Sequence, residues 1–251
     1  MCSSGQEQSP IDITILKGTC QQDMVLDLEW STQNIQTQLI KSETTISADG
    51  AWGYLYATTV DGNLFGYDAT SMQFHAPAEH RIESSSFDLE LQIIYKIKSE
   101  FTSYSRDTAI FSVLFQVDDN GPVDIFNTIN PQTLNTNFNL NLSNVMDKYI
   151  NTPTVYYTYK GSKTTPDCDQ TVNWYVASNH LKVSSSDLKK FTQYWGDNLN
   201  FANGTGNFRR TQNLNGRSVL QGGIQCQEQF VYFFSFFILY IFINYFIFKL
   251  L

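Results

Sequence analysis

The chain is poor in histidine: only His75, His80 and His180 occur among its 251 residues. Its four cysteines show no CxxC or other spacing typical of a metal site. Basic residues are also scarce, since 16 Lys and Arg stand against 24 Asp and Glu, giving a net charge of −8. No basic stripe is present to neutralise phosphates, which excludes nucleic acid as a partner.

Apolar and aromatic residues are abundant instead. Hydrophobic residues make up 42% of the chain, with 19 Phe, 14 Tyr and 4 Trp. This content excludes intrinsic disorder over most of the chain, because so many aromatic side chains cannot stay solvated. A chain of 251 residues is also long enough to bury a large core.

The C-terminal end carries a long apolar run, residues 230–248, without a single charge. As a helix this run would span about 28 Å, close to the ~30 Å hydrocarbon thickness of a bilayer. We therefore expect residues 230–251 to form a hydrophobic helix that contacts membrane lipid, preceded by a polar linker over 220–229. This tail is either a transmembrane span or the discarded signal for a glycolipid anchor. The alternative is a buried core helix.

The N-terminal end shows no apolar signal sequence after Met1. Taken literally, this predicts a tail-anchored protein that faces the cytosol, such as a subunit of an intracellular membrane complex. The competing interpretation is a sequence that lacks its true start and its signal peptide. That interpretation predicts a domain anchored at the cell surface or on the lumenal side of the secretory pathway.

Short runs of β-forming residues, separated by turn signals, recur through residues 1–219. The alternation predicts strands over residues 52–59, 87–97, 108–117, 154–159 and 172–177. Ser184 to Ser186 are suited to cap a helix over 187–194, in which Leu188, Phe191 and Tyr194 share one face. Many strands with few short helices predict a single, mainly β domain.

Five motifs occur in order along this domain. They are QSPIDI at 8–13, QFHAPAEH at 73–80, LELQII at 89–94, YKGSKTTPDC at 159–168 and NFRRTQNLNGR at 207–217. Together they resemble the QSPIDI, FHFHxPSEH, MELHLV, YxGSLTTPPC and NxRPxQxLNxR motifs of α-class carbonic anhydrases. The resemblance implies one domain over 1–219, built on a large, twisted, mostly antiparallel sheet of about ten strands.

The resemblance also implies a zinc site, which active members of that family build from three histidines. In this chain the three positions fall on Gln73, His75 and Gln92. A carboxamide oxygen is a weak ligand for zinc compared with an imidazole nitrogen. We therefore expect no zinc and no other cofactor, so that these positions are vestiges.

Three further residues match the family's catalytic machinery. The resemblance assigns Glu79 and Thr164 to a pair in which a buried carboxylate accepts a hydrogen bond from the threonine that orients zinc-bound hydroxide. It assigns Glu90 to the carboxylate that supports the third ligand, and here Glu90 would face Gln92. We expect all three to be inactive relics that keep structural hydrogen bonds, because buried polar groups need partners with or without a metal.

Other parts of the machinery differ as well. No histidine occurs before residue 75, so the family's proton shuttle is absent. Lys163 takes the place of a leucine at the wall of the CO₂ pocket, where it either extends out to solvent or blocks the pocket. A zinc site rebuilt from His75, His80 and a carboxylate remains an alternative, although strand geometry directs His80 to the opposite face.

Two cysteines occupy positions that are paired in secreted members of the family. Cys2 precedes the QSPIDI motif and Cys168 ends the YKGSKTTPDC motif, so the resemblance implies a disulfide between them. Such a bond needs an oxidising compartment.

These observations lead to two hypotheses for function. The first is a membrane-tethered, carbonic-anhydrase-like pseudoenzyme that acts as a binding or structural module, with protein partners or a membrane complex. The alternative is a weakly active zinc carbonate dehydratase, which hydrates CO₂ reversibly at an atypical metal site. Zinc is a cofactor only in the second.

Overall fold

The computed structural model describes residues 2, 5–14, 20–21, 23–101, 104–150, 154–196 and 202–223. The expected tail, residues 230–251, and most of the expected linker lie outside these described residues. Within the described ranges, no helix has the length and apolar character needed to cross a bilayer.

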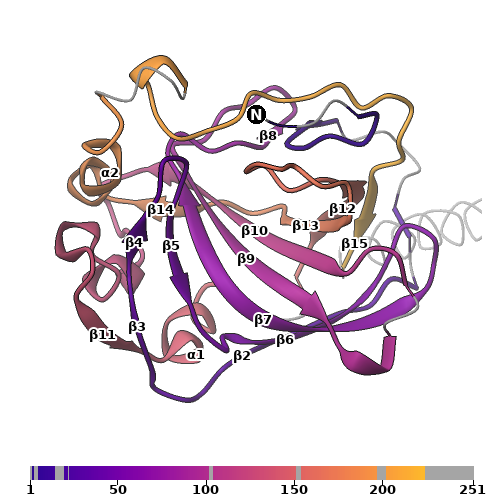
Figure 1. Ribbon diagram of the computed structural model, residues 1–251, viewed down its shortest axis with the longest axis horizontal. Coiled ribbons are helices and arrows are strands. Elements are labelled where there is room, and N and C mark those ends of the chain that lie inside the picture. The colour runs from indigo at the N-terminus through magenta and orange to yellow at the C-terminus, as the bar shows by residue number, and fades with distance from the viewer. Residues whose placement is uncertain are drawn as a thin grey trace, which may run out of the picture.

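A large curled sheet of eleven strands organises the domain (Figure 1). Its strands are β2 (Leu26–Trp30), β4 (Ile40–Lys41), β5 (Ile46–Asp49), β6 (Gly53–Thr58), β7 (Leu64–His75), β9 (Leu89–Ile97), β10 (Thr108–Val117), β12 (Tyr156–Gly161), β13 (Val172–Ala177), β14 (Leu181–Val183) and β15 (Leu220–Gly222). The main order is β15-β12-β13-β10-β9-β7-β5-β4, with β6 joining β2 to β7 and β14 paired with β10. The pairings are antiparallel except where β10 meets β13 and β14.

Smaller elements surround this sheet. Two strand pairs lie outside it: β1 (Asp12–Ile13) with β8 (Arg81–Ile82), and β3 (Ile35–Gln38) with β11 (Asn137–Leu140). The helices are α1 (Leu142–Met146), α2 (Ser185–Thr192) and the 3-10 turns η1 (Ser99–Phe101), η2 (Asp124–Asn127), η3 (Pro131–Thr133) and η4 (Ala202–Gly204). The Ser184 hydroxyl accepts a hydrogen bond from the Asp187 N–H at 3.0 Å, which confirms a serine cap for α2. The helix begins and ends two residues earlier than the predicted range 187–194, so Ser185 and Ser186 lie in its first turn.

Strand β10 shows how the sequence produces the core. Its residues are buried from Thr108 to Phe115, and they alternate between two faces of the sheet. Phe111 and Val113 pack in the larger hydrophobic cluster, whereas Ile110 and Leu114 pack in a second cluster on the other side. A strand covered on both faces needs apolar residues at nearly every position, which explains the continuous run TAIFSVLF.

The predicted strands all occur, as β6, β9, β10, β12 and β13, with ends shifted by one or two residues at β6, β9 and β12. The sequence patterns did not identify β14, because three residues are too few to show alternation, or β7, whose register is interrupted by an irregularity between Ala69 and Ser71. His180 therefore precedes a strand and not the helix α2, and its side chain is exposed. The mainly β fold with few helices is confirmed, while its predicted C-terminal helix lies outside the described residues.

Candidate functional site

The three positions that correspond to the family's zinc ligands lie together on two neighbouring strands. Gln73 and His75 end β7 with one residue between them, so both side chains face the same side of the sheet. Gln92 on β9 lies directly opposite Gln73 in the strand register. All three side chains are buried, and Gln92 and His75 have no exposed surface.

The two glutamines are bonded to each other and to acidic side chains. Gln73 donates from Nε2 to Gln92 Oε1 at 2.6 Å. The Nε2 of Gln92 in turn donates to Glu79 Oε2 and to Glu90 Oε1, both at 2.9 Å. Ionised carboxylates can only accept, so they hold the nitrogen of the Gln92 amide on their side. The carbonyl oxygen of Gln92 is thereby directed at Gln73.

His75 is bonded through only one of its ring nitrogens. Nδ1 lies 2.7 Å from the main-chain oxygen of Asn207 and 3.5 Å from Glu79 Oε1. A carbonyl oxygen can only accept, so Nδ1 carries a proton, and in the neutral ring Nε2 presents a lone pair. Nε2 is buried and has no hydrogen-bond partner among the described residues.

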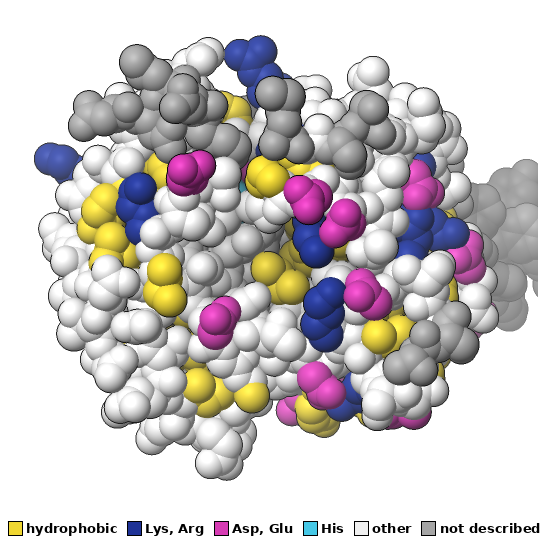
Figure 2. Space-filling view, viewed as in Figure 1, with side chains coloured by type: hydrophobic (Ala, Val, Ile, Leu, Met, Phe, Trp, Pro, Cys, Tyr) yellow, Lys and Arg dark blue, Asp and Glu magenta, His cyan; other side chains and the backbone are white. Residues whose placement is uncertain are grey.

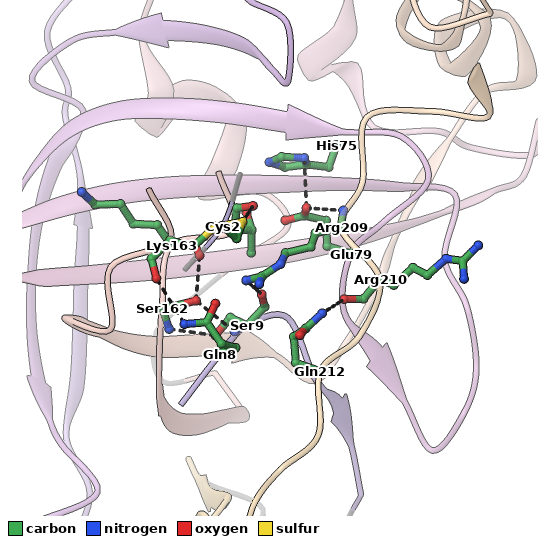
Figure 3. The surroundings of a disulfide bond; sticks show 12 residues. Cys2, Gln8, Ser9, His75, Glu79, Ser162, Lys163, Arg209, Arg210 and Gln212 are labelled. Atoms are coloured by element: carbon green, nitrogen blue, oxygen red, sulfur yellow. Dashed lines mark hydrogen bonds and ion pairs between the residues drawn. A yellow bond between two sulfur atoms is a disulfide. The ribbon is translucent and has the colours of Figure 1, made fainter. Parts of the chain in front are cut away.

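The expected hydrogen bond between Glu79 and Thr164 is absent, which corrects the sequence-based expectation. Glu79 Oε1 accepts from the main-chain N–H of Arg209 at 2.8 Å, and Oε2 accepts from Gln92 (Figure 3). The Thr164 hydroxyl is buried and has no partner within the described part of the chain. A glutamine at position 92 brings an amide donor to Glu79, and this donor occupies an oxygen of the carboxylate.

Glu90 accepts more hydrogen bonds than any other carboxylate in this cluster. Its donors are the main-chain N–H groups of Glu79 and His80, the His80 ring, the Gln92 amide and the Ser112 hydroxyl. Burial by itself favours the neutral acid and raises the pKa of Glu90. The neighbouring His80, through its charge and its hydrogen bonds, outweighs burial and lowers this pKa below its usual range, with help from Ser112.

His80 belongs to this second arrangement and does not join His75. Its Nδ1 lies 2.8 Å from Glu90 Oε1 and its Nε2 lies 2.7 Å from the Tyr159 hydroxyl. Both ring nitrogens therefore have partners. Within the described ranges, no three His, Cys, Asp or Glu side chains are grouped so that they could hold a metal ion.

Lys163 extends away from His75 (Figure 3). Its Nζ lies 3.3 Å from Asp169 Oδ2, and both side chains are partly exposed. The long stem thus carries the ammonium group out to solvent, the first of the two outcomes expected from the sequence.

A disulfide joins Cys2 to Cys168 across 166 positions of sequence, as the resemblance implied (Figure 3). Two bonds next to it fasten the same N-terminal segment: Gln8 Nε2 donates to the Cys168 oxygen, and the Ser9 N–H donates to the Ser162 hydroxyl. Closing so long a loop contributes about 5 kcal/mol in the chain-entropy model. No described cysteine is a free thiol.

Sequence reasoning assigned no role to Asn207, which organises the end of β7. Its Oδ1 accepts from the Ala76 N–H at 2.7 Å, and its Nδ2 donates to the Phe74 oxygen at 2.8 Å. Its own carbonyl oxygen receives the His75 ring. The signal was available, because Asn207 opens the last of the five motifs, but only the folded chain brings it to His75.

Comparison with known proteins matches this chain to carbonic anhydrases. The family model for eukaryotic-type carbonic anhydrase matches residues 1–222. The chain is 26% identical over 233 residues to the carbonic anhydrase of Nostoc sp., covering 88% of this chain and 78% of that protein. It is likewise 26% identical over 226 residues to alpha carbonic anhydrase 4 of Arabidopsis thaliana, covering 87% and 76%.

Solved structures share the fold. Carbonic anhydrase Cah3 from Chlamydomonas reinhardtii, in complex with acetazolamide, matches with a TM-score of 0.68 at 22% identity, covering 86% of this chain and 91% of that one. A crystal structure of dioscorin complexed with ascorbate also matches with a TM-score of 0.68, at 23% identity and covering 87% of each chain. At these identities the likeness concerns the fold alone.

Proposed function

The chain belongs to the eukaryotic-type carbonic anhydrase family, and we propose that it is a member that neither holds zinc nor hydrates CO₂. In this proposal the domain acts as a binding or structural module. It serves protein partners or a membrane complex to which its C-terminal segment tethers it.

The bonding of Gln92 is the observation that carries this proposal. A zinc ligand must direct a lone pair at the metal, and imidazole does so far better than a carboxamide. The one accepting atom of the Gln92 side chain already receives a hydrogen bond from Gln73, and its nitrogen serves two carboxylates. Binding zinc would break the Gln73–Gln92 bond and offer only weak neutral donors in return. The donor set therefore does not fit a zinc site of the family's type, and we derive no catalytic step from it.

One observation favours the alternative of a weakly active zinc carbonate dehydratase. The Nε2 of His75 is buried and has no partner among the described residues, while Nδ1 donates to a main-chain carbonyl. Metal-binding histidines are commonly oriented in this way by a carbonyl behind the ring. A single imidazole of this kind can provide one ligand, and the rest of an atypical site would have to come from amide or hydroxyl oxygens.

Zinc content separates the two hypotheses. We expect the purified full-length chain, after dialysis against metal-free buffer, to contain far less than one zinc per chain by mass spectrometry. We expect the double variant Gln73→His/Gln92→His to retain about one zinc per chain, because three imidazoles suffice for a family-type site. The matched control adds His75→Ala to the double variant and should lose the metal again.

The opposite results would be decisive. About one zinc per chain in the unmodified protein, together with CO₂ hydration above the buffer rate in stopped-flow measurements, would establish the alternative. A double variant that folds but binds no zinc would mean that these three positions do not form the family's metal site.

We further propose that residues 230–251, which lie outside the described residues, tether the domain to the cell surface or to the lumenal side of the secretory pathway. The Cys2–Cys168 disulfide supports an oxidising compartment. Release of the protein from cells by a phosphatidylinositol-specific phospholipase would identify a glycolipid anchor. Resistance to that enzyme and to alkaline carbonate would identify a membrane span, and recovery in the soluble fraction would contradict the tether.

A further inference from the structure

A pocket of about 400 Å³ lies where residues 77–86 meet residues 208–211, and Gln73, His75 and Gln92 are not among its lining residues. Three of the chain's five arginines line it: Arg81, Arg209 and Arg210. Phe208 and Pro77 provide apolar surface, and Thr211 contributes a polar residue. Such a concentration of arginine is unexpected in a chain with a net charge of −8.

Most of the other described basic residues have an acidic partner, whereas these three arginines have none among the described residues. Across the described residues, seven lysines form ion pairs with aspartates, and Arg106 pairs with Glu7. On the face shown in Figure 2, basic and acidic side chains accordingly lie beside one another. None of the pocket's three arginines has a carboxylate within ion-pair distance in the described part of the chain.

Arg81 retains unused hydrogen-bonding capacity. Its Nε is buried and has no partner among the residues described. Asp12 lies opposite Arg81 in the β1–β8 register, but its carboxylate binds the N–H and the hydroxyl of Ser84. The nearest strand partner therefore leaves Arg81 uncompensated.

Two of the pocket's other charged residues, Glu79 and Arg209, are held by hydrogen bonds. Glu79 also lines it, but this carboxylate is buried and both oxygens accept hydrogen bonds, from Arg209 and from Gln92. The Arg209 guanidinium donates to the Ser9 oxygen at 2.7 Å, which holds it in place (Figure 3). Arg210 is exposed, and Figure 3 shows its side chain extending to the opposite side of the chain from that of Arg209. Arg81 and Arg210 are thus available to a ligand.

We propose that this pocket binds a small organic anion in which a carboxylate or phosphate group adjoins an apolar body. Guanidinium groups recognise such oxyanions through paired N–H donors, and arginine does so more specifically than lysine. Arg81 and Arg210 bind the oxyanion, Arg209 adds a fixed positive charge, and Phe208 with Pro77 contacts the apolar part. The site is independent of the proposed loss of zinc, because it contains none of the three vestigial ligand positions.

The test is a titration of the full-length chain, followed by calorimetry, with benzoate and phenyl phosphate as probes. Acetate and inorganic phosphate serve as the matching anions without an apolar body. We expect saturable binding, tighter for the two aromatic probes, and about tenfold weaker in Arg210→Gln and in Arg81→Gln. Lys148→Gln is the matched control, since it removes one surface charge outside the pocket and should leave the affinity unchanged.

The outcomes distinguish a specific anion site from non-specific attraction of anions to basic side chains on the surface. Weakening by the arginine variants alone supports the pocket, and the tighter of benzoate and phenyl phosphate identifies its preferred head group. Absence of saturable binding for every probe would overturn the proposal, as would equal weakening by Lys148→Gln. Arg210→Gln alters an exposed side chain, so the test holds even if Arg81→Gln fails to fold.

Discussion

Two buried histidines, five residues apart, lie in regions that differ in how completely they are bonded. The His80 region, comprising His80, Glu90, Ser112 and Tyr159, uses both nitrogens of its histidine. The His80 ring also lies 4.6 Å from the ring of Trp174, edge to face. The His75 region, which we define as the family-matched positions Gln73, His75, Gln92 and Thr164, includes two buried polar atoms without partners in the described structure.

The two regions therefore differ in role: the hydrogen bonds of the His80 region stabilise the fold, whereas the His75 region retains unpaired polar atoms at positions of the family's metal site. A buried polar atom without a partner costs about 1–3 kcal/mol, so most are satisfied in native proteins. The His80 region bears no such cost, because protein atoms satisfy both ring nitrogens of His80. In the His75 region, the ring nitrogen Nε2 of His75 and the hydroxyl of Thr164 have no described partner, at positions that active members of the family use around a metal. The side-chain amides of Gln73 and Gln92 are hydrogen-bonded to each other.

The largest expected effect is on the His80 region. Glu90→Gln removes a buried charge that accepts five hydrogen bonds, and it directs an amide nitrogen at some of those donors. We expect the free energy of unfolding, measured with urea, to fall by about 3–5 kcal/mol. Glu79→Gln is the matched control and should cost less, because among the described residues Glu79 accepts hydrogen bonds only from Arg209 and Gln92. An equal loss in both variants would erase the distinction between the regions.

A smaller effect concerns acid stability. The pKa of Glu90 is lower in the folded protein than in the unfolded chain, so its stabilising contribution is fully present above the unfolded value of about 4.3 and declines as pH falls below it. Between that value and the folded pKa of about 2, the unmodified chain should lose up to about 1.4 kcal/mol per pH unit through this group. Glu90→Gln lacks the titrating carboxyl and should show a shallower decline. Parallel pH profiles of unfolding for the two proteins would refute the lowered pKa.

The smallest effect is expected in the His75 region. Thr164→Val replaces a hydroxyl that has no partner among the described residues by a methyl group of similar size. We expect the free energy of unfolding to stay the same or to rise by up to about 1 kcal/mol. In the matched control, Thr37→Val, the hydroxyl that donates to the Asp49 oxygen at 2.8 Å is lost, which should cost about 1 kcal/mol. A clear loss in Thr164→Val would show that this hydroxyl is bonded in solution.

Strand positions could be predicted where the apolar run was clear, whereas the twelve-residue β7 was not identified from its alternation. Residues 108–117 and 172–177 were identified with their correct ends, because buried strands of this length show a clear apolar run. The three-residue strand β14 was missed for want of any pattern. The motifs predicted that Gln73, His75 and Gln92 would meet, and the β7–β9 register brings them together.

The sequence by itself determined the family and the chemical inventory of the site, because motif order and residue identity do not depend on coordinates. It thus established that a single imidazole, His75, stands among the three ligand positions. Only the tertiary structure decided how that inventory is bonded. In the folded chain the Gln92 amide donates to an oxygen of Glu79, and the Thr164 hydroxyl has no described partner. Arg81 and Arg210 line the same pocket. A hydrogen bond needs a donor–acceptor distance of about 3 Å, set to within a few tenths of an ångström. The bonded segments are often more than a hundred residues apart, and no local pattern encodes their separation.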